Sequence, residues 1–484
     1  MIPSSRRLAA LLSAALLAAS SLAAQDNAAP ELSLEQCVTR ALQRNFALEI
    51  GRYAPEIAKD GILVAKGTYE TQLSVTGSRS GRESDLSGTS SNGTDLRVGV
   101  TQRLYTGTTV SASSSIARSS SNPALATNPA YDADLTLSVR QSLLQGLDPA
   151  VNRGGIERAE IGLQRANLDY KAQVLDVIQD TENAYYNLAY AREQFGVRNF
   201  SLALAQKLFD EAKTRRDTGV ATDLDVLQAE VGVANARRAV ILAEQAVKDR
   251  QDALLALIGQ FELDAPLGTV RFKDASGQLP VFASSFQMAK QNQPDYLSSQ
   301  AAIEQVKIDL RLVKDAAKPD LTVGAALGLN GTNGSSGDAF SDALDPQSHN
   351  WQVDFSFNYP LGRKSDKARE RQSLAALSRE QTRLRQLEQS IEVSVRSAVR
   401  SVEANTESVR IAALASALSQ KQYELEKAKF DAGLSTSRRV LEAQDDLETA
   451  RVSELQARVS LANAISALHR LEGSSLQRYA VELP

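Results

Sequence analysis

The sequence predicts a mixed α/β membrane protein, in which a β-barrel continues into long α-helical coiled-coil hairpins. Three observations predict this fold class. The chain begins with a signal-peptide pattern, two very long helical patterns each end at a glycine turn, and segments of alternating hydrophobicity precede each long helix. Because this whole order of segments occurs twice, we also expect an internal duplication.

Residues 1–24 are typical of a secretory signal peptide. Arg6 and Arg7 give a charged start, residues 8–17 are apolar, and small residues at 23–24 suit cleavage. A single membrane anchor is the alternative interpretation, but the apolar run is short and contains a serine. After this segment the sequence has no run of about 18 apolar residues, so we expect no spanning helix in the mature chain.

Composition excludes several classes of protein. The 484 residues are 43% hydrophobic and 23% charged with a formal net charge of -4, and they contain no basic run of the kind that binds nucleic acid. Cys37 is the only cysteine, which excludes an internal disulfide. His349 and His469 lack the companions that catalysis or metal binding needs. We therefore expect no catalytic residue, no metal site, no cofactor and no nucleic-acid partner.

Two similar stretches reveal the duplication. RRDTGVATDLDVLQAE (215–230) and KFDAGLSTSRRVLEAQ (429–444) lie 214 residues apart, and the match extends without a gap into the helices around them. Upstream, residues 73–75 match residues 321–323 at an offset of 248. The difference, 248 minus 214, means that the first copy carries 34 extra residues between its first strand and its long helix.

The repeat also sets the expected domain boundaries. A first repeat at 25–260 is joined by a connector at 261–282 to a second repeat at 283–473, and a tail at 474–484 follows. Each repeat consists of a helix, a set of strands and a long helical hairpin, which we expect at 33–66, 69–145 and 152–258 in the first repeat and at 283–316, 319–362 and 365–472 in the second.

The long helices cannot be stable alone. Apolar residues recur at steps of three and four, for example at Val174, Ile178 and Tyr185, and about 65 residues form a rod of roughly 100 Å. Such a rod needs coiled-coil neighbours. We expect the return helix of each hairpin and the shorter helix of each repeat to stack end to end beside it.

The alternating segments are apolar on one face and polar or small on the other. In WQVDFSFNY, Trp351 and Tyr359 bracket the apolar positions, and eight tilted residues span roughly 20 Å. Those two side chains are candidates for an aromatic girdle at the lipid surface. Alternation alone fits a soluble sheet with one wet face equally well, but the signal peptide and the aromatic spacing favour an outer-membrane barrel.

The chain resembles the TolC family of outer-membrane efflux ducts. The resemblance covers the mature chain and rests on LSLEQCVTRALQRN (32–45), on the strand-to-helix corners QSLLQG (141–146) and NYPLG (358–362), and on both glycine turns. It implies a homotrimer in the outer membrane of a Gram-negative-type cell, with its β-barrel in contact with outer-membrane lipid and a periplasmic α-helical barrel below.

The resemblance also implies function and partners. A periplasmic adaptor (membrane fusion) protein and an inner-membrane pump of the RND, ABC or MFS type would feed the duct, which would passively conduct substrates in tripartite efflux or type I secretion. It would not be an enzyme. Two alternatives stay open: a structural or adhesive envelope protein without transport, and a soluble coiled-coil scaffold.

In this family the glycine turns are the periplasmic tips of the helical hairpins. The resemblance implies that they meet the adaptor, although a role in the turn and in packing alone is the alternative. The candidate contact residues are Arg215, Gly219, Val220, Leu227, Lys429, Gly433, Leu434 and Leu441.

Family members close the tunnel just past the second tip with acidic and hydrogen-bonded constrictions. The aligned gate candidates here are Arg439 and Glu442, with Asp225 and Gln228 in the first copy. Arg439 departs from the family's acidic residue. Ordinary solvated charges on helices are the alternative interpretation.

The extra residues of the first repeat contain two more alternating segments, at 95–104 and 109–118, joined by YTGT. If they are part of the wall, a trimer has eighteen strands rather than the family's usual twelve. Alternatively, the insertion folds outside the wall.

Overall fold

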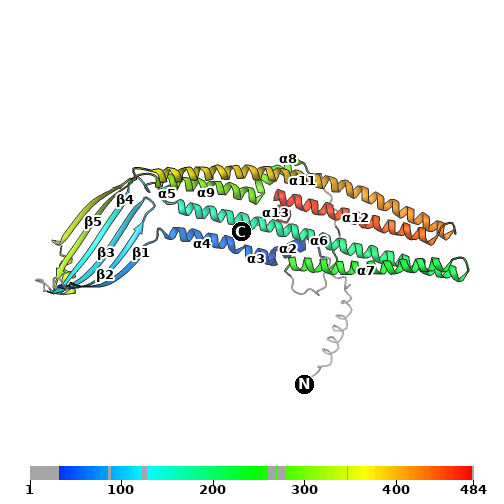
Figure 1. Cartoon of the computed structure of the whole chain (residues 1–484), viewed down its shortest axis with the longest axis horizontal. Helices are drawn as coiled ribbons and strands as arrows, with labels where there is room; N and C mark the ends of the chain where they lie inside the picture. The colour runs from blue at the N-terminus through cyan, green and yellow to red at the C-terminus, as the bar shows by residue number, and fades with distance from the viewer. Residues whose placement is uncertain are drawn as a thin grey trace, which may run out of the picture.

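The structure is a computed structural model that describes residues 32–84, 89–122, 128–259, 268–270, 272, 279–345 and 347–481. The expected signal peptide and most of the expected connector lie outside these residues. The molecule is a long rod of helices with a β-sheet at one end (Figure 1). No helix in the described part of the chain is long and apolar enough to cross a membrane.

Two very long helices run along the rod. α6 (Gly154–Asp217) has 64 residues and α11 (Lys364–Asp431) has 68. Each reverses at a glycine turn into a return helix, α7 (Asp223–Leu257) or α12 (Ser437–Glu472). The first and last residues of each helical hairpin lie within two residues of the bounds expected from the sequence. A short helix, α5 (Pro149–Asn152), precedes α6.

The prediction of one continuous helix at 33–66 and another at 283–316 was wrong. The first is divided into α2 (Leu34–Arg44), α3 (Phe46–Gly51) and α4 (Tyr53–Gly67), and the second into α8 (Phe282–Asn292) and α9 (Pro294–Ala316). Asn45 is extended, and its side chain accepts a hydrogen bond from the N–H of Ala47, so it caps the next helix. Gln293 is extended because proline follows it.

The return helices stack end to end with the divided helices, at two equivalent junctions. Gly259 and Gly473 both have φ +68°, a backbone conformation that favours glycine. A Cβ on Gly259 would lie 2.3 Å from the carbonyl oxygen of Arg44, and one on Gly473 would lie 2.9 Å from the Cβ of Asn292. Both junctions therefore need glycine, because the backbone has a positive φ and because a neighbouring residue leaves no room for a Cβ. The two repeats thus have the same structure at this point.

The strands form one antiparallel sheet in sequence order. The first repeat contributes β1 (Gln72–Ser84), β2 (Thr89–Arg103), β3 (Thr108–Asn122) and β4 (Ala130–Ser142), and the second contributes β5 (Asp320–Asn333) and β6 (His349–Asn358). A short helix, α10 (Ser336–Ala343), lies between β5 and β6. The extra residues of the first repeat therefore become β2 and β3, in the middle of the sheet.

The main hydrophobic core lies near the middle of the rod, where the two repeats meet. Leu175, Ile178, Leu188 and Leu254 are among its fully buried side chains. Beside it, the carboxylate of Glu182 accepts hydrogen bonds from Ser466 of α12 and Tyr479 of the C-terminal segment, which includes the short helix α13 (Ser475–Arg478). The expected tail is thus docked on the helical rod.

Candidate functional site: the hairpin tips

The two hairpin turns lie at the end of the rod furthest from the sheet and have the same geometry (Figure 1). Gly219 has φ +77° and Gly433 has φ +76°. The N–H of the next residue, Val220 or Leu434, donates to the carbonyl oxygen of Arg215 or Lys429 at 2.8 Å in both turns. This is a Schellman-type helix end, in which a positive φ lets the chain reverse in a few residues.

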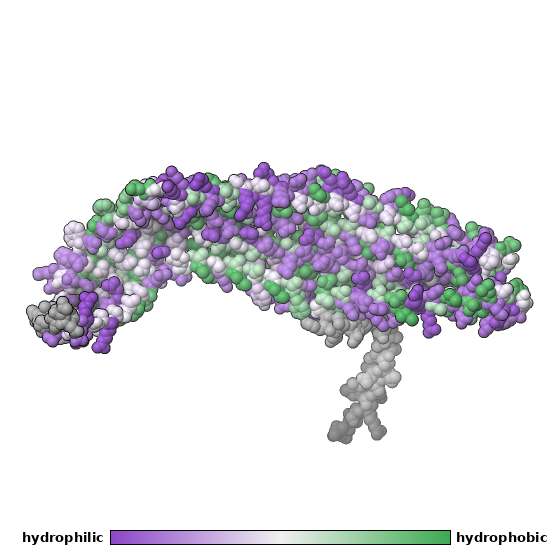
Figure 2. All heavy atoms as spheres, in the orientation of Figure 1, coloured by the Kyte–Doolittle hydropathy of each residue, from purple (hydrophilic) through white to green (hydrophobic). Residues whose placement is uncertain are grey.

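The tips present apolar side chains to solvent. Val220 is 76% exposed and Leu434 is 80% exposed, at matching positions of the two turns. Hydrophobic residues are visible at this end of the rod in Figure 2. Leu227 is also exposed, but its counterpart Leu441 is half-buried and lies close to Gly232 of α7. Val220, Leu434 and Leu227 therefore form an exposed apolar set, from which Leu441 is excluded by packing.

The two basic tip residues have different environments. Both Nη atoms of Arg215 donate to the carbonyl oxygen of Phe430 at 3.2 Å, and its guanidinium lies 4.0 Å from the centre of the Phe430 ring. Lys429 pairs instead with Glu426 of its own helix at 3.2 Å. Arg215 consequently holds the first hairpin against the second, whereas Lys429 stays on the surface of α11.

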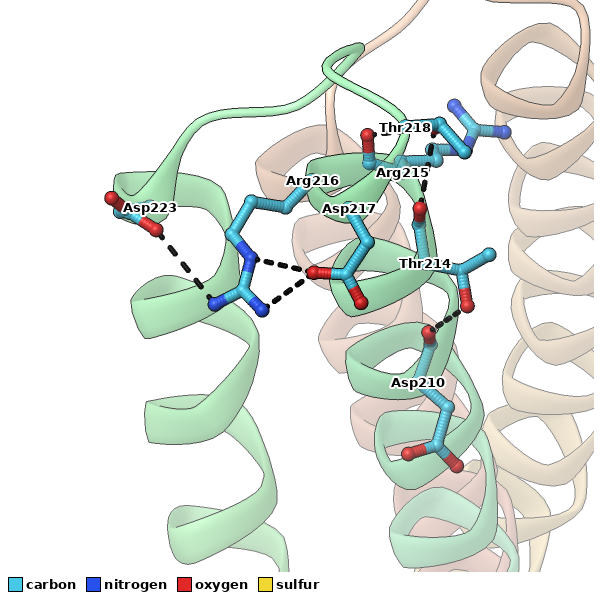
Figure 3. A network of polar contacts seen from close by, with 7 residues as sticks. All are labelled: Asp210, Thr214, Arg215, Arg216, Asp217, Thr218 and Asp223. Atoms are coloured by element: carbon cyan, nitrogen blue, oxygen red, sulfur yellow. Dashed lines mark hydrogen bonds and ion pairs between the residues drawn. The ribbon is translucent and has the colours of Figure 1, made fainter.

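A second polar network at the first tip was not predicted from the sequence (Figure 3). Arg216 points across the turn toward α7, where it lies 3.8 Å from Asp223, and it donates to Asp217 at 2.6 Å. Arg215 points away from this network (Figure 3). The two adjacent arginines thus have different roles: Arg216 stabilises the turn, and Arg215 contacts the neighbouring hairpin.

The gate candidate Asp225 lies between the two hairpins. Its Oδ2 accepts hydrogen bonds from the backbone N–H and the hydroxyl of Thr222, at 2.9 and 2.7 Å, and its Oδ1 accepts from Ser437 of α12 at 3.4 Å. These bonds, those from Thr222 first, lower the pKa of the Asp225 carboxyl. Asp225 is therefore a helix-capping carboxylate that also faces the second hairpin. Gln228 follows on the same helix and is half-buried.

The gate candidates of the second tip face solvent. Arg439 is exposed, and Glu442 pairs along its own helix with Arg438 at 3.0 Å. Nearby, hydrogen bonds from Ser435 and Lys429, helped by the charge of Arg439, lower the pKa of Glu426. Asp225 thus contacts the other hairpin, whereas Glu442 and Arg439 are exposed on α12, and Glu442 pairs within that helix.

The hairpins meet along an interface that the sequence analysis did not identify. Gln444 of α12 donates to the carbonyl oxygen of Ser201 at 2.8 Å, in a buried position, and Lys427 lies 3.6 Å from Glu211. The signal was available, because apolar positions on both hairpins follow helical spacing, but only the fold shows which helices are neighbours. A small apolar core fills the interface: Leu208, Tyr423, Phe430, Val440, Ala443 and Leu447.

The two candidate girdle residues lie at opposite ends of β6. Trp351 is exposed and pairs across the sheet with Leu327. Tyr359 follows the last residue of the strand, on the side of the helices, and the guanidinium of Arg363 lies 5.5 Å from its ring centre.

Comparison with known proteins assigns the chain to a family. A family model described as outer membrane efflux protein matches residues 148–260 and 286–474, and the chain belongs to this family. It is 24% identical over 356 residues to the pyoverdine export outer membrane protein OpmQ of Pseudomonas putida, which covers 70% of this chain and 71% of OpmQ.

Solved structures show the same fold. The outer-membrane channel OprN matches 91% of this chain and 89% of its own, with a TM-score of 0.70 and 16% identity. The CmeC outer membrane channel of Campylobacter jejuni matches 93% of this chain and 90% of its own, with the same TM-score and identity.

The chain is therefore an outer-membrane exit duct used in efflux, and it is not an enzyme. It acts as a homotrimer whose helical domain lies in the periplasm, and it works with a periplasmic adaptor and an inner-membrane pump.

Proposed function

We propose that the hairpin tips are the control point of this duct: they close its periplasmic mouth and receive the adaptor. The observation that carries the proposal is the pair of hairpins joined by polar contacts near their ends. Arg215 reaches the carbonyl of Phe430, and Asp225 reaches Ser437. Contacts of this kind can be exchanged for others at low cost, because each is exposed or partly exposed and contributes about 0.5–1.5 kcal/mol.

Gate and adaptor functions are assigned to different side chains. Asp225, Gln228, Arg439 and Glu442 would line the mouth, where three copies bring charges of both signs around the axis. Val220 and Leu434, with the glycine turns beneath them, would make the apolar contact with the adaptor, and Leu227 extends this surface. Arg215 and Leu441 would act indirectly, because both are engaged with the neighbouring hairpin.

Single-channel conductance in a planar bilayer tests the gate. We expect a small conductance for the wild-type trimer and a larger one for the Asp225→Ala, Arg439→Ala and Glu442→Ala variants. Lys248→Ala is the matched control, because Lys248 is an exposed residue in the second half of α7, far along the chain from the turn, and it pairs with Glu244 of its own helix at 3.0 Å. A wild-type conductance that is already large and unchanged in all variants would place the constriction elsewhere.

Adaptor contact is tested by photo-crosslinking in cells that express the cognate adaptor. A photoreactive residue at position 220 or 434 should yield an adaptor crosslink, whereas one at position 248 should not. The OpmQ relatives are named for pyoverdine export, so pyoverdine is the first cargo to assay. A structural or adhesive protein would instead give no adaptor crosslink, and cells that lack it would export the cargo normally.

A further inference from the structure

The extra hairpin, β2 and β3, carries the same two faces as the rest of the sheet. One row of paired residues crosses all six strands: Leu73, Val100, Ala112, Leu137, Leu327 and Trp351. The adjacent row on the opposite face also crosses all six: Ser74, Gly99, Ser113, Thr136, Gly328 and Asn350. An apolar row beside a small or polar row is the pattern of a wall with lipid on one side and water on the other.

The turn of this hairpin is built into the base of the helical domain. Gly107, at φ +76°, lies so close to the chain that a Cβ there would be 2.3 Å from the carbonyl oxygen of Gly146. Gln141 and Asn152 donate to the carbonyl oxygens of Thr106 and Tyr105, at 2.9 and 2.8 Å. The turn therefore packs tightly into the corner between β4 and α6. Such packing is expected of a hairpin within the wall and not of an insertion that folds outside it.

Within the part of the chain that the structure describes, the sheet has two edge strands without a partner on their outer side. There, β1 pairs with β2 alone and β6 pairs with β5 alone. Both edge strands carry exposed apolar residues on the same face, Leu73 and Val75 on β1 and Val353 and Phe355 on β6. A long apolar edge is unstable in isolation, and in a closed homotrimer β6 of one copy can pair with β1 of the next copy.

We propose that the trimer closes into a wall of eighteen strands, six from each copy. The proposal rests on the homotrimer and is independent of the gate assigned to the hairpin tips. Barrel diameter grows roughly linearly with strand number, so the exit is about one and a half times as wide as in a twelve-stranded family member. The outer-membrane part is then a wider outlet than a twelve-stranded wall provides, and it admits larger cargo.

Spin-label accessibility in reconstituted trimers tests whether β2 belongs to the wall. Single cysteines at Leu96, Val98 and Val100 should be accessible to oxygen dissolved in the lipid, and those at Arg97 and Thr101 to a water-soluble nickel chelate. Positions 137 and 136 of β4 are matched controls for the two faces, and the buried Cys37 is replaced by serine. Uniform access to the chelate along β2, with alternation kept in β4, would overturn the proposal.

Polymer exclusion measures the width directly. Polyethylene glycols of increasing size are added to the external side of wild-type trimers and of a variant lacking residues 89–122, and the largest polymer that lowers the conductance is recorded. We expect the wild-type outlet to be about one and a half times as wide as that of the deletion variant. Equal exclusion limits in the two proteins would refute the wide wall. Gate variants should leave the limit unchanged, so a failure here is separable from a failure of the proposed gate.

Discussion

The two repeats agree closely in the helical rod and differ in the sheet. In the rod, the turns at Gly219 and Gly433 and the junctions at Gly259 and Gly473 have nearly identical backbone geometry. In the sheet, one repeat contributes four strands and the other two. The difference shows where duplication is constrained. Helices of both repeats must pack beside each other over the same length, whereas an antiparallel sheet accepts another hairpin without changing the faces of its neighbours.

The largest expected effect tests whether the two repeats contribute equally to the core. Leu254 of α7 and Leu468 of α12 are equivalent positions and are both buried. Either Leu→Ala substitution should lower the free energy of unfolding by about 2–5 kcal/mol. Chemical denaturation of the purified protein measures this. A loss at Leu254 with none at Leu468 would show that the second repeat contributes little to the cooperative unit.

A glycine comparison separates backbone strain from close packing. Gly259 and Gly219 both have positive φ, but only Gly259 is in close contact with a neighbour, Arg44. Gly219→Ala should cost about 1–2 kcal/mol from strain alone, and Gly259→Ala should cost clearly more. Thermal unfolding of both variants gives the difference. Equal costs would mean that the junction relaxes freely and is not a fixed point of the rod.

Buried Glu182 marks a place where the repeats diverge. Tyr479 donates to Glu182 at 2.5 Å, whereas Arg396, the residue at the equivalent position in the second repeat, pairs with Glu392 near the surface. Tyr479→Phe should lower the free energy of unfolding by about 1–3 kcal/mol, because a buried carboxylate loses a donor. Tyr359→Phe, at the base of the sheet, is a control of the same chemistry. A neutral Tyr479→Phe variant would mean that the docked tail does not stabilise the rod.

The smallest expected effect is a pH dependence from His469, whose counterpart in the first repeat is Leu255. Burial, followed by the nearby charge of Arg478, lowers the pKa of His469 below its ordinary value of 6.5. The folded state therefore binds fewer protons than the unfolded state, so the stability contribution is complete above pH 6.5 and declines as the pH falls below it. His469→Leu should flatten the stability profile between pH 7 and pH 5. An unchanged slope would assign the pH dependence to carboxylates.

Much of the rod could be predicted from the sequence, because glycine, the absence of proline and helical spacing determine where long helices begin and end. The hairpin bounds followed from Gly219 and Gly433. The break at Asn45 was missed, although asparagine is a strong cap, because the helical spacing continues through it. The strands of the extra hairpin were visible as alternation, but their position within one continuous sheet depends on pairing partners that alternation does not specify.

The candidate site was less predictable for a similar reason. The sequence indicates where the turns are. However, the contact of Arg215 with the second hairpin depends on a carbonyl oxygen 215 residues away, and the burial of Leu441 depends on a glycine of another helix. Interactions between distant segments leave no periodic signal in either of them.

The sheet of this protein can change its size only in pairs of strands. β1 starts at the helical end of the sheet and β6 returns to it, so both long helices leave from the same side (Figure 1). A single added strand would deliver the following helix to the opposite side of the membrane. Each accepted insertion is therefore a hairpin, and three-fold symmetry multiplies it, so that the bore of such an outlet evolves in steps of six strands.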